Sequence, residues 1–360
     1  MTDNTENRDS GKKIAASKST EKYHSKAQSD PKVTLAMLHP KYWPQWLASF
    51  VLRLIVLLPY PVFMTLGRIL GYLAMAVLPR RRHISEQNFR LAFPEMKDEE
   101  IRSLTKEHFA NCGMGLFETA MAWYWPEWRL KKMVHIDPEQ LKKARELAES
   151  GKGIVVLTCH FVTLELMARM YGTNIKKGVG VYRPNDNPVI EYLQVVGRTR
   201  SNLYLVDRKE PRPIVKALMK GLPIWYAPDQ DYGKRLPHVF APFFGVKDAA
   251  TVTGTAGFAK IRNTVVQPSY SIRLPGFKGY RLVVEDVLEN FPAGDDLQDA
   301  ATCNHVVENM IKEALPQYMW LEPQRQQLRY GRSREQLPAQ PALRYRRNSV
   351  SLRSARFLYM

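Results

Sequence analysis

Cysteine is scarce in this chain of 360 residues, which contains only Cys112, Cys159 and Cys303. The three form neither a CxxC pair nor an even-numbered framework, so the sequence argues against a disulfide scaffold or a zinc ribbon and favours a reducing compartment. A phosphate-binding P-loop, a G-x-G-x-x-G fingerprint and a G-x-S-x-G nucleophile elbow are also missing from the sequence. These absences exclude the most easily recognised nucleotide-binding and serine-hydrolase sites.

Acidic residues are few relative to basic ones: 35 Asp and Glu stand against 53 Lys and Arg, which gives a formal net charge of +18. Such a field favours polyanionic partners, which include nucleic acid, anionic lipid headgroups, phosphorylated substrates and an acidic carrier protein. No RNA- or DNA-reading motif is visible, so no nucleic acid is expected as a partner. At 45% hydrophobic residues, the chain can form one large domain or one domain with appendages.

The first 33 residues hold almost no large apolar side chain. Such a segment cannot offset its ordering entropy by burial, so residues 1–33 are expected to form a disordered tail. No apolar stretch follows a short basic start, so the tail is not a signal peptide.

Residues 34–83 are predicted to be a membrane-anchoring helical segment. Its apolar part at 46–78 contains two runs separated by a Pro-Tyr-Pro sequence, and each run is shorter than the roughly 20 residues that span a bilayer as a helix. Three alternatives stay open: one spanning helix, two short helices embedded in one leaflet, or two buried core helices. Trp43 and Trp46 stand where interface aromatics do, and the arginines at 80–82 would keep the following part of the chain in the cytoplasm.

Residues 84–321 read as an α/β domain. Short apolar runs typical of fully buried strands lie at 154–158, 179–182, 203–206 and 224–227, and helical patterns separate them. This alternation predicts a parallel sheet with right-handed crossovers. Extended stretches near 265–272 and 280–288, a helix at 297–315 and a mainly helical region at 84–125 complete a mostly parallel sheet flanked by helices.

His160 is the residue most suited to catalysis, because it lies just past a buried strand, where open α/β sheets place ligands. Glu165 follows five residues later. His160 should therefore lie in the turn before a helix, with Glu165 on the first turns of that helix and its carboxylate reaching back to one imidazole nitrogen. Imidazole is a suitable base near neutral pH, and a carboxylate fixes its tautomer, so the pair could activate a substrate hydroxyl.

Other interpretations of this region are simpler. His160 can cap a helix while Glu165 faces solvent, and Cys159 is better suited to packing in the core than to acting as a nucleophile. No further ligand stands at metal-binding spacing, so no metal site is predicted.

The motifs along the chain resemble those of the late acyltransferases of lipid A biosynthesis, in the lauroyl and palmitoleoyl branch. They occur in unbroken order over residues 35–321: LHPKYWPQWL, LPYPVF, NFRLAFPEM, GMGLFETAMAWYWP, HFVTLEL, VYRPNDNP, YAPDQDYG and AATVTGT. The resemblance implies a glycerolipid-acyltransferase-like fold at the bacterial inner membrane. It also implies that His160 and Glu165 match the family's catalytic pair.

The resemblance further implies a reaction. Members of the family move a fatty acyl group from acyl carrier protein to a hydroxyl of a 3-hydroxyacyl chain on Kdo2-lipid IVA, and no metal or dissociable cofactor is implied. An acyltransferase for another lipid acceptor, and a non-enzymatic basic membrane-binding protein, remain the alternatives.

Six further residues are expected to bind substrate: Arg183, Arg198, Arg200, Asp229, Gln230 and Asp231. The arginines would meet phosphates or carboxylates of the substrate, or else a structural partner or solvent. The three residues of the DQD sequence would line the cleft and position Arg183 or sugar hydroxyls, or else serve only the turn.

The sequence departs from the family's usual ending after Trp320. Residues 322–360 contain nine arginines and no lysine, without a helical or strand period. We expect this segment to be a disordered extension that arose by fusion or by a shifted reading frame.

Overall fold

The computed structural model describes residues 30–230 and 236–321 of the chain. Most of the predicted tail at 1–33 and all of the extension at 322–360 lie outside this part, so both expectations stay predictions. The predicted boundary near residue 83 falls inside helix α4 (Pro79–Ala92).

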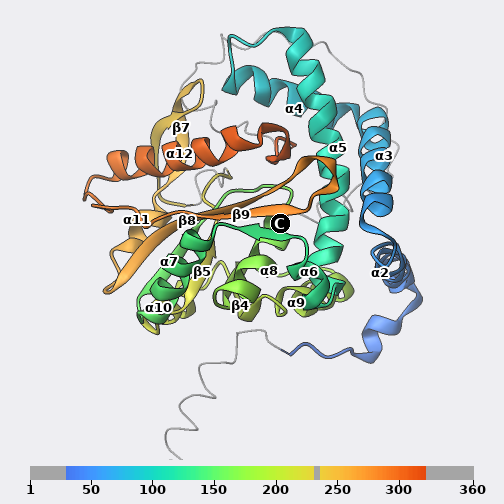
Figure 1. Cartoon of the computed structure of the whole chain (residues 1–360), viewed down its shortest axis with the longest axis horizontal. Coiled ribbons are helices and arrows are strands. Elements are labelled where there is room, and N and C mark those ends of the chain that lie inside the picture. The colour runs from blue at the N-terminus through green and yellow to red at the C-terminus, as the bar shows by residue number, and fades with distance from the viewer. Residues whose placement is uncertain (1–29, 231–235, 322–360) are drawn as a thin grey trace, which may run out of the picture.

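A mixed sheet of seven strands lies at the centre of the fold, in the order β1-β9-β8-β2-β5-β3-β4 (Figure 1). Its strands are β1 (Val134–Ile136), β2 (Gly153–Leu157), β3 (Gly178–Tyr182), β4 (Asn202–Asp207), β5 (Pro223–Tyr226), β8 (Thr264–Arg273) and β9 (Tyr280–Val284). The four short apolar runs and the two later extended stretches are thereby confirmed as strands. The short strand β1 and the antiparallel hairpin of β6 (His238–Phe243) and β7 (Val246–Val252) are not predicted from the sequence.

The strands from β8 to β4 pair in parallel, as the alternation of strands and helices predicts. Strand β9 instead pairs antiparallel with β8, and β1 pairs with β9. The prediction of a mostly parallel sheet is therefore confirmed: β1 and β9 are parallel to each other, and β8–β9 is the antiparallel pair of this seven-stranded sheet. The connection at 274–279 is too short for a crossover, and such a short connection permits only antiparallel pairing.

Helices cover both faces of the sheet because its central strand is buried on both. Val155 and Leu157 of β2 belong to one apolar cluster, while Ile154 and Val156 belong to the other. The first cluster includes side chains of α10 (Pro211–Met219), α11 (Gly254–Ala259) and α12 (Asp296–Glu313). The second includes side chains of α3 (Tyr60–Val77), α5 (Asp98–Tyr124), α7 (Pro138–Glu149) and α8 (Leu164–Asn174).

Local sequence fixes where several helices begin. Asp137 caps α7 by accepting hydrogen bonds from two backbone N–H groups, and Asn187 caps α9 (Pro188–Arg198) in the same way. Both caps precede a proline at the first helical position, where its missing N–H costs nothing. The remaining helices are α2 (Trp43–Ile55) and α6 (Glu127–Lys131).

Helix α3 lies along the long helix α5 at the edge of the molecule (Figure 1). It buries Phe63 and Met64 completely in the core. Where the two helices are closest, a Cβ atom on Gly113 of α5 would lie 2.1 Å from the carbonyl oxygen of Gly67. The helices therefore touch backbone to backbone, and α3 is part of the folded body.

The other side of α2 and α3 is a broad exposed apolar surface. Its exposed side chains include Leu47, Phe50, Leu54, Leu57, Val62, Leu66, Ile69, Leu73 and Val77. The alternative of two fully buried core helices is therefore wrong. Within the described ranges, α3 is the one helix long and apolar enough to cross a bilayer, a test that core helices of soluble proteins also pass.

The close contact of α3 with α5 predicts the effect of a single methyl group. In Gly71→Ala, the new Cβ would lie 2.1 Å from the carbonyl oxygen of Phe109, so the helices must separate. Alanine favours a helix by about 1 kcal/mol over glycine, but overpacking costs about 1–3 kcal/mol. We therefore expect the free energy of unfolding to fall, measured by denaturant unfolding of the purified protein in detergent.

Gly257→Ala is the matched control, because a Cβ there has no atom within 4 Å. It should leave stability unchanged or raise it slightly. Equal stability of the Gly71→Ala and Gly257→Ala variants would contradict the packing described here.

Candidate active site

His160 lies in the turn that joins β2 to α8, as the sequence predicts. The turn is fixed from two sides. The backbone N–H of Thr158 donates to the carbonyl oxygen of Tyr226 at 3.0 Å, and that of Met319 donates to the carbonyl oxygen of His160 at 2.9 Å. The imidazole is consequently carried by a backbone with little freedom to move.

Asp229, which follows strand β5, holds His160. Its Oδ1 lies 2.9 Å from Nδ1 of the imidazole, and its Oδ2 accepts the backbone N–H of His160 at 2.9 Å. The two residues meet because β2 and β5 are parallel neighbours, with Leu157 opposite Tyr226, so their turns leave the same edge of the sheet. An ionised carboxylate can only accept, so Nδ1 carries the proton and Nε2 is the basic nitrogen.

The surroundings of Asp229 keep it ionised. Its side chain is fully buried, whereas that of His160 is 16% exposed. Burial would raise the pKa of the Asp229 carboxyl, but the charge and hydrogen bonds of His160, together with a hydrogen bond from the Tyr318 hydroxyl, hold it below its ordinary value. In the described part of the chain, Nε2 of His160 has no hydrogen-bond partner. The site therefore contains an oriented imidazole with one nitrogen free to accept a proton.

Glu165 does not contact His160 in the described structure, which corrects the expectation that its carboxylate reaches back to the imidazole. It lies at the start of α8, as predicted, but its carboxylate faces α9 and α5. Arg198 donates to it through Nε at 2.7 Å and also through Nη2, and Trp123 Nε1 donates at 3.2 Å. The Glu165 carboxylate is thus paired with Arg198 in a largely buried ion pair. Asp229, rather than Glu165, is the carboxylate that contacts the imidazole of His160.

The three arginines expected to bind substrate have different surroundings. Arg198 is held by Glu165 with 18% of its side chain exposed. Arg200 donates to the carbonyl oxygens of Trp123 and Trp125 at 3.1 and 2.9 Å, and these contacts fix the end of α5. Arg183 follows β3 at the same edge of the sheet as His160, and 42% of its side chain is exposed. Substrate binding by the three arginines stays a prediction, and Arg183 is more exposed than Arg198.

Gln230, Asp231 and Cys159 are the chain neighbours of Asp229 and His160. Gln230 follows Asp229 and is half-buried, and Asp231 lies outside the described residues. Cys159 is fully buried, and burial raises the pKa of its thiol well above the ordinary value. A protonated buried thiol is a poor nucleophile, in agreement with the predicted packing role of Cys159.

Sequence reasoning missed the part played by the segment after α12. Besides Met319 and Tyr318, this segment contributes Gln317, whose carbonyl oxygen accepts the backbone N–H of Val162 at 2.8 Å. Phe161 forms an isolated antiparallel bridge with Tyr318. Three consecutive residues thereby hold the His160 turn. The signal in the sequence is that the resemblance to the family continues up to Trp320, which does not say what the residues touch.

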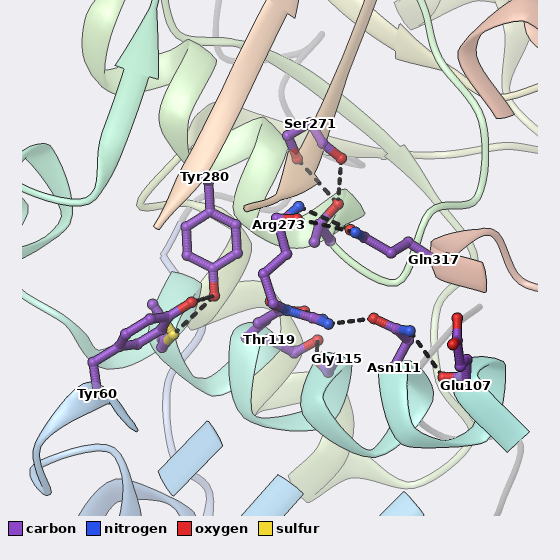
Figure 2. A network of polar contacts seen from close by, with 12 residues as sticks. Tyr60, Glu107, Asn111, Gly115, Thr119, Ser271, Arg273, Tyr280 and Gln317 are labelled. Carbon is purple, nitrogen blue, oxygen red and sulfur yellow. Dashed lines mark hydrogen bonds and ion pairs between the residues drawn. The ribbon is translucent and has the colours of Figure 1, made fainter. Parts of the chain in front are cut away.

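A buried polar network fixes this segment in turn (Figure 2). Gln317 and Arg273 of β8 exchange two hydrogen bonds, from the Arg273 N–H to Oε1 at 2.8 Å and from Nε2 to the Arg273 carbonyl at 3.1 Å. The Arg273 guanidinium pairs with both carboxylate oxygens of Glu118 at 2.6 Å and also donates to Asn111. Burial opposes the positive charge, but Glu118 outweighs it and raises the pKa of Arg273. The network therefore connects α5 and β8 to the turn that carries His160.

Comparison with known proteins identifies the family to which this fold and site belong. The sequence profile of the family described as bacterial lipid A biosynthesis acyltransferase matches residues 31–327. The chain is 45% identical to the lipid A biosynthesis lauroyltransferase of Escherichia coli (strain K12), over 81% of this chain and 94% of that protein. The chain belongs to the bacterial lipid A biosynthesis acyltransferases.

Other members of the family are also similar to this acyltransferase. Identity is 38% with the lipid A biosynthesis palmitoleoyltransferase of E. coli, over 81% of this chain and 93% of the relative. It is 26% with the E. coli myristoyltransferase, over 81% and 89%. The resemblance stated from the motifs is confirmed, and the chain is a lipid A biosynthesis acyltransferase.

The buried pair of Glu118 and Arg273 predicts a large effect on stability. Both side chains are almost fully buried, at 0% and 8% exposure, so Glu118→Gln leaves an unpaired cation in the core. Breaking one partner of such a pair costs about 3–5 kcal/mol. We expect a loss of that order in the free energy of unfolding, measured by denaturant unfolding in detergent. The double variant Glu118→Leu with Arg273→Met should lose less, because no buried charge remains.

The surface pair of Glu313 and Arg281 is the control, since 43% and 46% of these side chains are exposed. Glu313→Gln should cost about 1 kcal/mol or less. A cost for Glu118→Gln no larger than that would show that the buried pair does not stabilise the acyltransferase as argued.

Proposed function

We propose that this acyltransferase moves a fatty acyl chain, lauroyl or palmitoleoyl, from the thioester of acyl carrier protein to a hydroxyl of a 3-hydroxyacyl chain on Kdo2-lipid IVA. The observation that carries the proposal is the imidazole of His160 held by a buried carboxylate at the carboxyl edge of the sheet, in a member of this family. The similarity to a lauroyltransferase and a palmitoleoyltransferase supports the choice of acyl chain.

In the proposed reaction, His160 acts as general base and Asp229 orients it. Nε2 takes the proton from the acceptor hydroxyl as its oxygen attacks the thioester carbonyl. The tetrahedral intermediate then collapses, the carbon–sulfur bond breaks, and the imidazolium returns the proton to the departing thiolate. The products are an ester on the lipid and the free thiol of the carrier. Asp229 stabilises the imidazolium that forms between these steps.

We assign Glu165 and Arg198 a different part in the same reaction. Because Glu165 holds the guanidinium of Arg198 in place, Arg198 can present a fixed positive charge to the acceptor. Arg183, at the end of β3, would supply a second and more exposed charge. The acceptor class carries phosphate and carboxylate groups, for which guanidinium is the preferred partner.

We also propose that the protein is attached to the cytoplasmic face of the inner membrane through α2 and α3. The apolar surface of these helices supports this, because soluble proteins rarely expose continuous apolar patches of such extent. The packing of α3 along α5 favours helices embedded in one leaflet. A spanning α3 would draw the polar body around α5 into hydrocarbon, which buries polar groups at high cost.

Substitutions can distinguish the proposed roles of Asp229 and Glu165 in the reaction. His160→Ala and Asp229→Asn should each lower kcat by about 10²–10⁴-fold, the usual worth of general-base catalysis. Glu165→Gln should lower kcat far less and should mainly raise KM for the acceptor lipid. Rates are measured with purified enzyme, and unchanged unfolding temperatures serve as the control for folding. If Glu165→Gln lowers kcat as much as His160→Ala does, while Asp229→Asn has a nearly normal kcat, then Glu165 rather than Asp229 is the partner of His160 in catalysis.

The donor and acceptor are tested directly with membranes that contain the protein. We expect acylation of tetra-acylated Kdo-lipid by acyl carrier protein thioesters, fastest with the lauroyl or palmitoleoyl donor, detected by mass spectrometry. The same membranes with the His160→Ala variant are the control. Transfer to glycerol phosphate or a glycosyl lipid, with none to Kdo-lipid, would replace the proposed acceptor.

A further inference from the structure

Apolar side chains from three separate segments are exposed around the turn between α2 and α3. Leu57 and Leu58 belong to that turn, with 70% and 38% of their surface exposed. Trp128 on α6 is 62% exposed, and Phe277 in the loop between β8 and β9 is 45% exposed. We refer to these four residues as the rim.

Contacts between the segments place the rim residues in one region. Arg129, next to Trp128, donates to the carbonyl oxygen of Leu58 at 2.8 Å. The ring of Phe277 lies edge-on to that of Tyr60, with centroids 6.2 Å apart. His135 of β1, the strand that follows α6 in the chain, contacts the carbonyl oxygen of Lys278 in the β8–β9 loop at 2.9 Å. The rim therefore continues the apolar surface of α2 and α3 onto the catalytic body.

The loop between β8 and β9 has a left-handed backbone at its tip. Phe277 has a backbone φ of 59°, in the left-handed region between Gly276 and Gly279, which have φ of 66° and 90°. This conformation costs a side chain with a Cβ about 1–2 kcal/mol. The contact of its ring with Tyr60 offsets part of that cost, while 45% of the side chain stays exposed. The strained tip thus presents an apolar ring to the surroundings of the protein.

Positive charge surrounds the rim. The ammonium of Lys132 lies 5.2 Å above the ring of Trp128, and Lys278 follows Phe277 on the exposed loop. Arg129 adds a charge stacked on Trp125, 3.9 Å from its ring. The acidic residue of α6, Glu127, is paired with Lys131 at 2.7 Å. Tryptophan beside lysine is the composition typical of groups at the boundary between lipid headgroups and acyl chains.

We propose that the rim extends the lipid contact of α2 and α3 onto the catalytic body and binds the headgroup region of an anionic bilayer. Trp128 and Phe277 enter the boundary between headgroups and acyl chains, while Lys132 and Lys278 meet the anionic headgroups. This inference rests on the proposed attachment through α2 and α3. Charge and continuity with that apolar surface favour a bilayer over a protein partner.

The depth of single positions in a membrane tests the proposal. Cysteine is placed at Phe277, Trp128, Leu73 on α3 or Met219 on α10, and labelled with an environment-sensitive fluorophore in the full-length protein. The native Cys159 and Cys303 are buried, and Cys112 is replaced by serine in all variants. Met219 is the matched control, because it is 70% exposed on a helix on the sheet's other apolar side. The proteins are reconstituted in vesicles whose lipids carry a quencher near the headgroup.

We expect several-fold stronger quenching at Phe277→Cys and Trp128→Cys than at Met219→Cys. The Lys132→Ala and Lys278→Ala double substitution should reduce the quenching at Phe277→Cys, and so should replacement of phosphatidylglycerol by phosphatidylcholine. If Leu73→Cys is quenched but neither rim position is quenched above the level of Met219→Cys, lipid contact by the rim is ruled out. The proposed attachment through α2 and α3 would still stand. Absence of quenching at Leu73→Cys as well would instead overturn the proposed attachment.

A contact between protein copies would give a different result. In lipid-free detergent, the rim labels would then shift their emission with protein concentration, and sedimentation would show a dimer. That outcome would replace the bilayer as the occupant of the rim and overturn the proposal.

Discussion

Helix α5 and strand β8 can pack only if the charges of Glu118 and Arg273 leave water together. Desolvating a carboxylate and a guanidinium is costly, and their attraction offsets that cost only when the geometry is complete. Both carboxylate oxygens of Glu118 are bound, Asn111 accepts from the guanidinium, and the backbone of Arg273 is paired with Gln317. Each unmet polar group would cost about 1–3 kcal/mol, so this network strongly favours one arrangement of α5, β8 and the segment after α12.

The site inherits its geometry from this arrangement. Gln317 holds the backbone of Val162, Met319 holds that of His160, and the Tyr318 hydroxyl meets Asp229. His160 and Asp229 therefore come from two parallel strands, and a third segment fixes both of them. An imidazole placed in this way needs little reorganisation when charge develops on it, which is the condition for effective electrostatic stabilisation.

The sequence locates His160 and every strand of the central sheet except β1, because these features depend on local pattern. The strands are continuous apolar runs, and a polar residue after such a run lies at the carboxyl edge of the sheet. The partner of His160 cannot be predicted in this way, because Asp229 is 69 residues away in the sequence. The carboxylate of Glu165 is nearer in the sequence and is therefore the plausible local alternative. Arg198 of α9 donates a hydrogen bond to Glu165 of α8, and no local sequence pattern predicts that contact.

The same limit explains why Arg200 was expected to bind substrate. Its charge is evident in the sequence, but its two acceptors are backbone carbonyl oxygens at the end of α5. Backbone acceptors carry no signature in side-chain type. A prediction from charge alone therefore does not separate arginines that bind the backbone from those that face a ligand, because their guanidinium groups look alike in the sequence.

The requirements of attachment and of the site meet in α5. On one side, its Gly113 touches the backbone of Gly67 in α3, whose outer surface is apolar. On another side, its Glu118 carries the ion pair that supports the His160 turn. At the glycines the two backbones meet with no side chain between them, and Phe63 packs edge-on against Phe117 beside them, so α3 and α5 move as one body. If α3 lies in the membrane, the orientation of His160 relative to the lipid surface is consequently set by packing rather than by a linker.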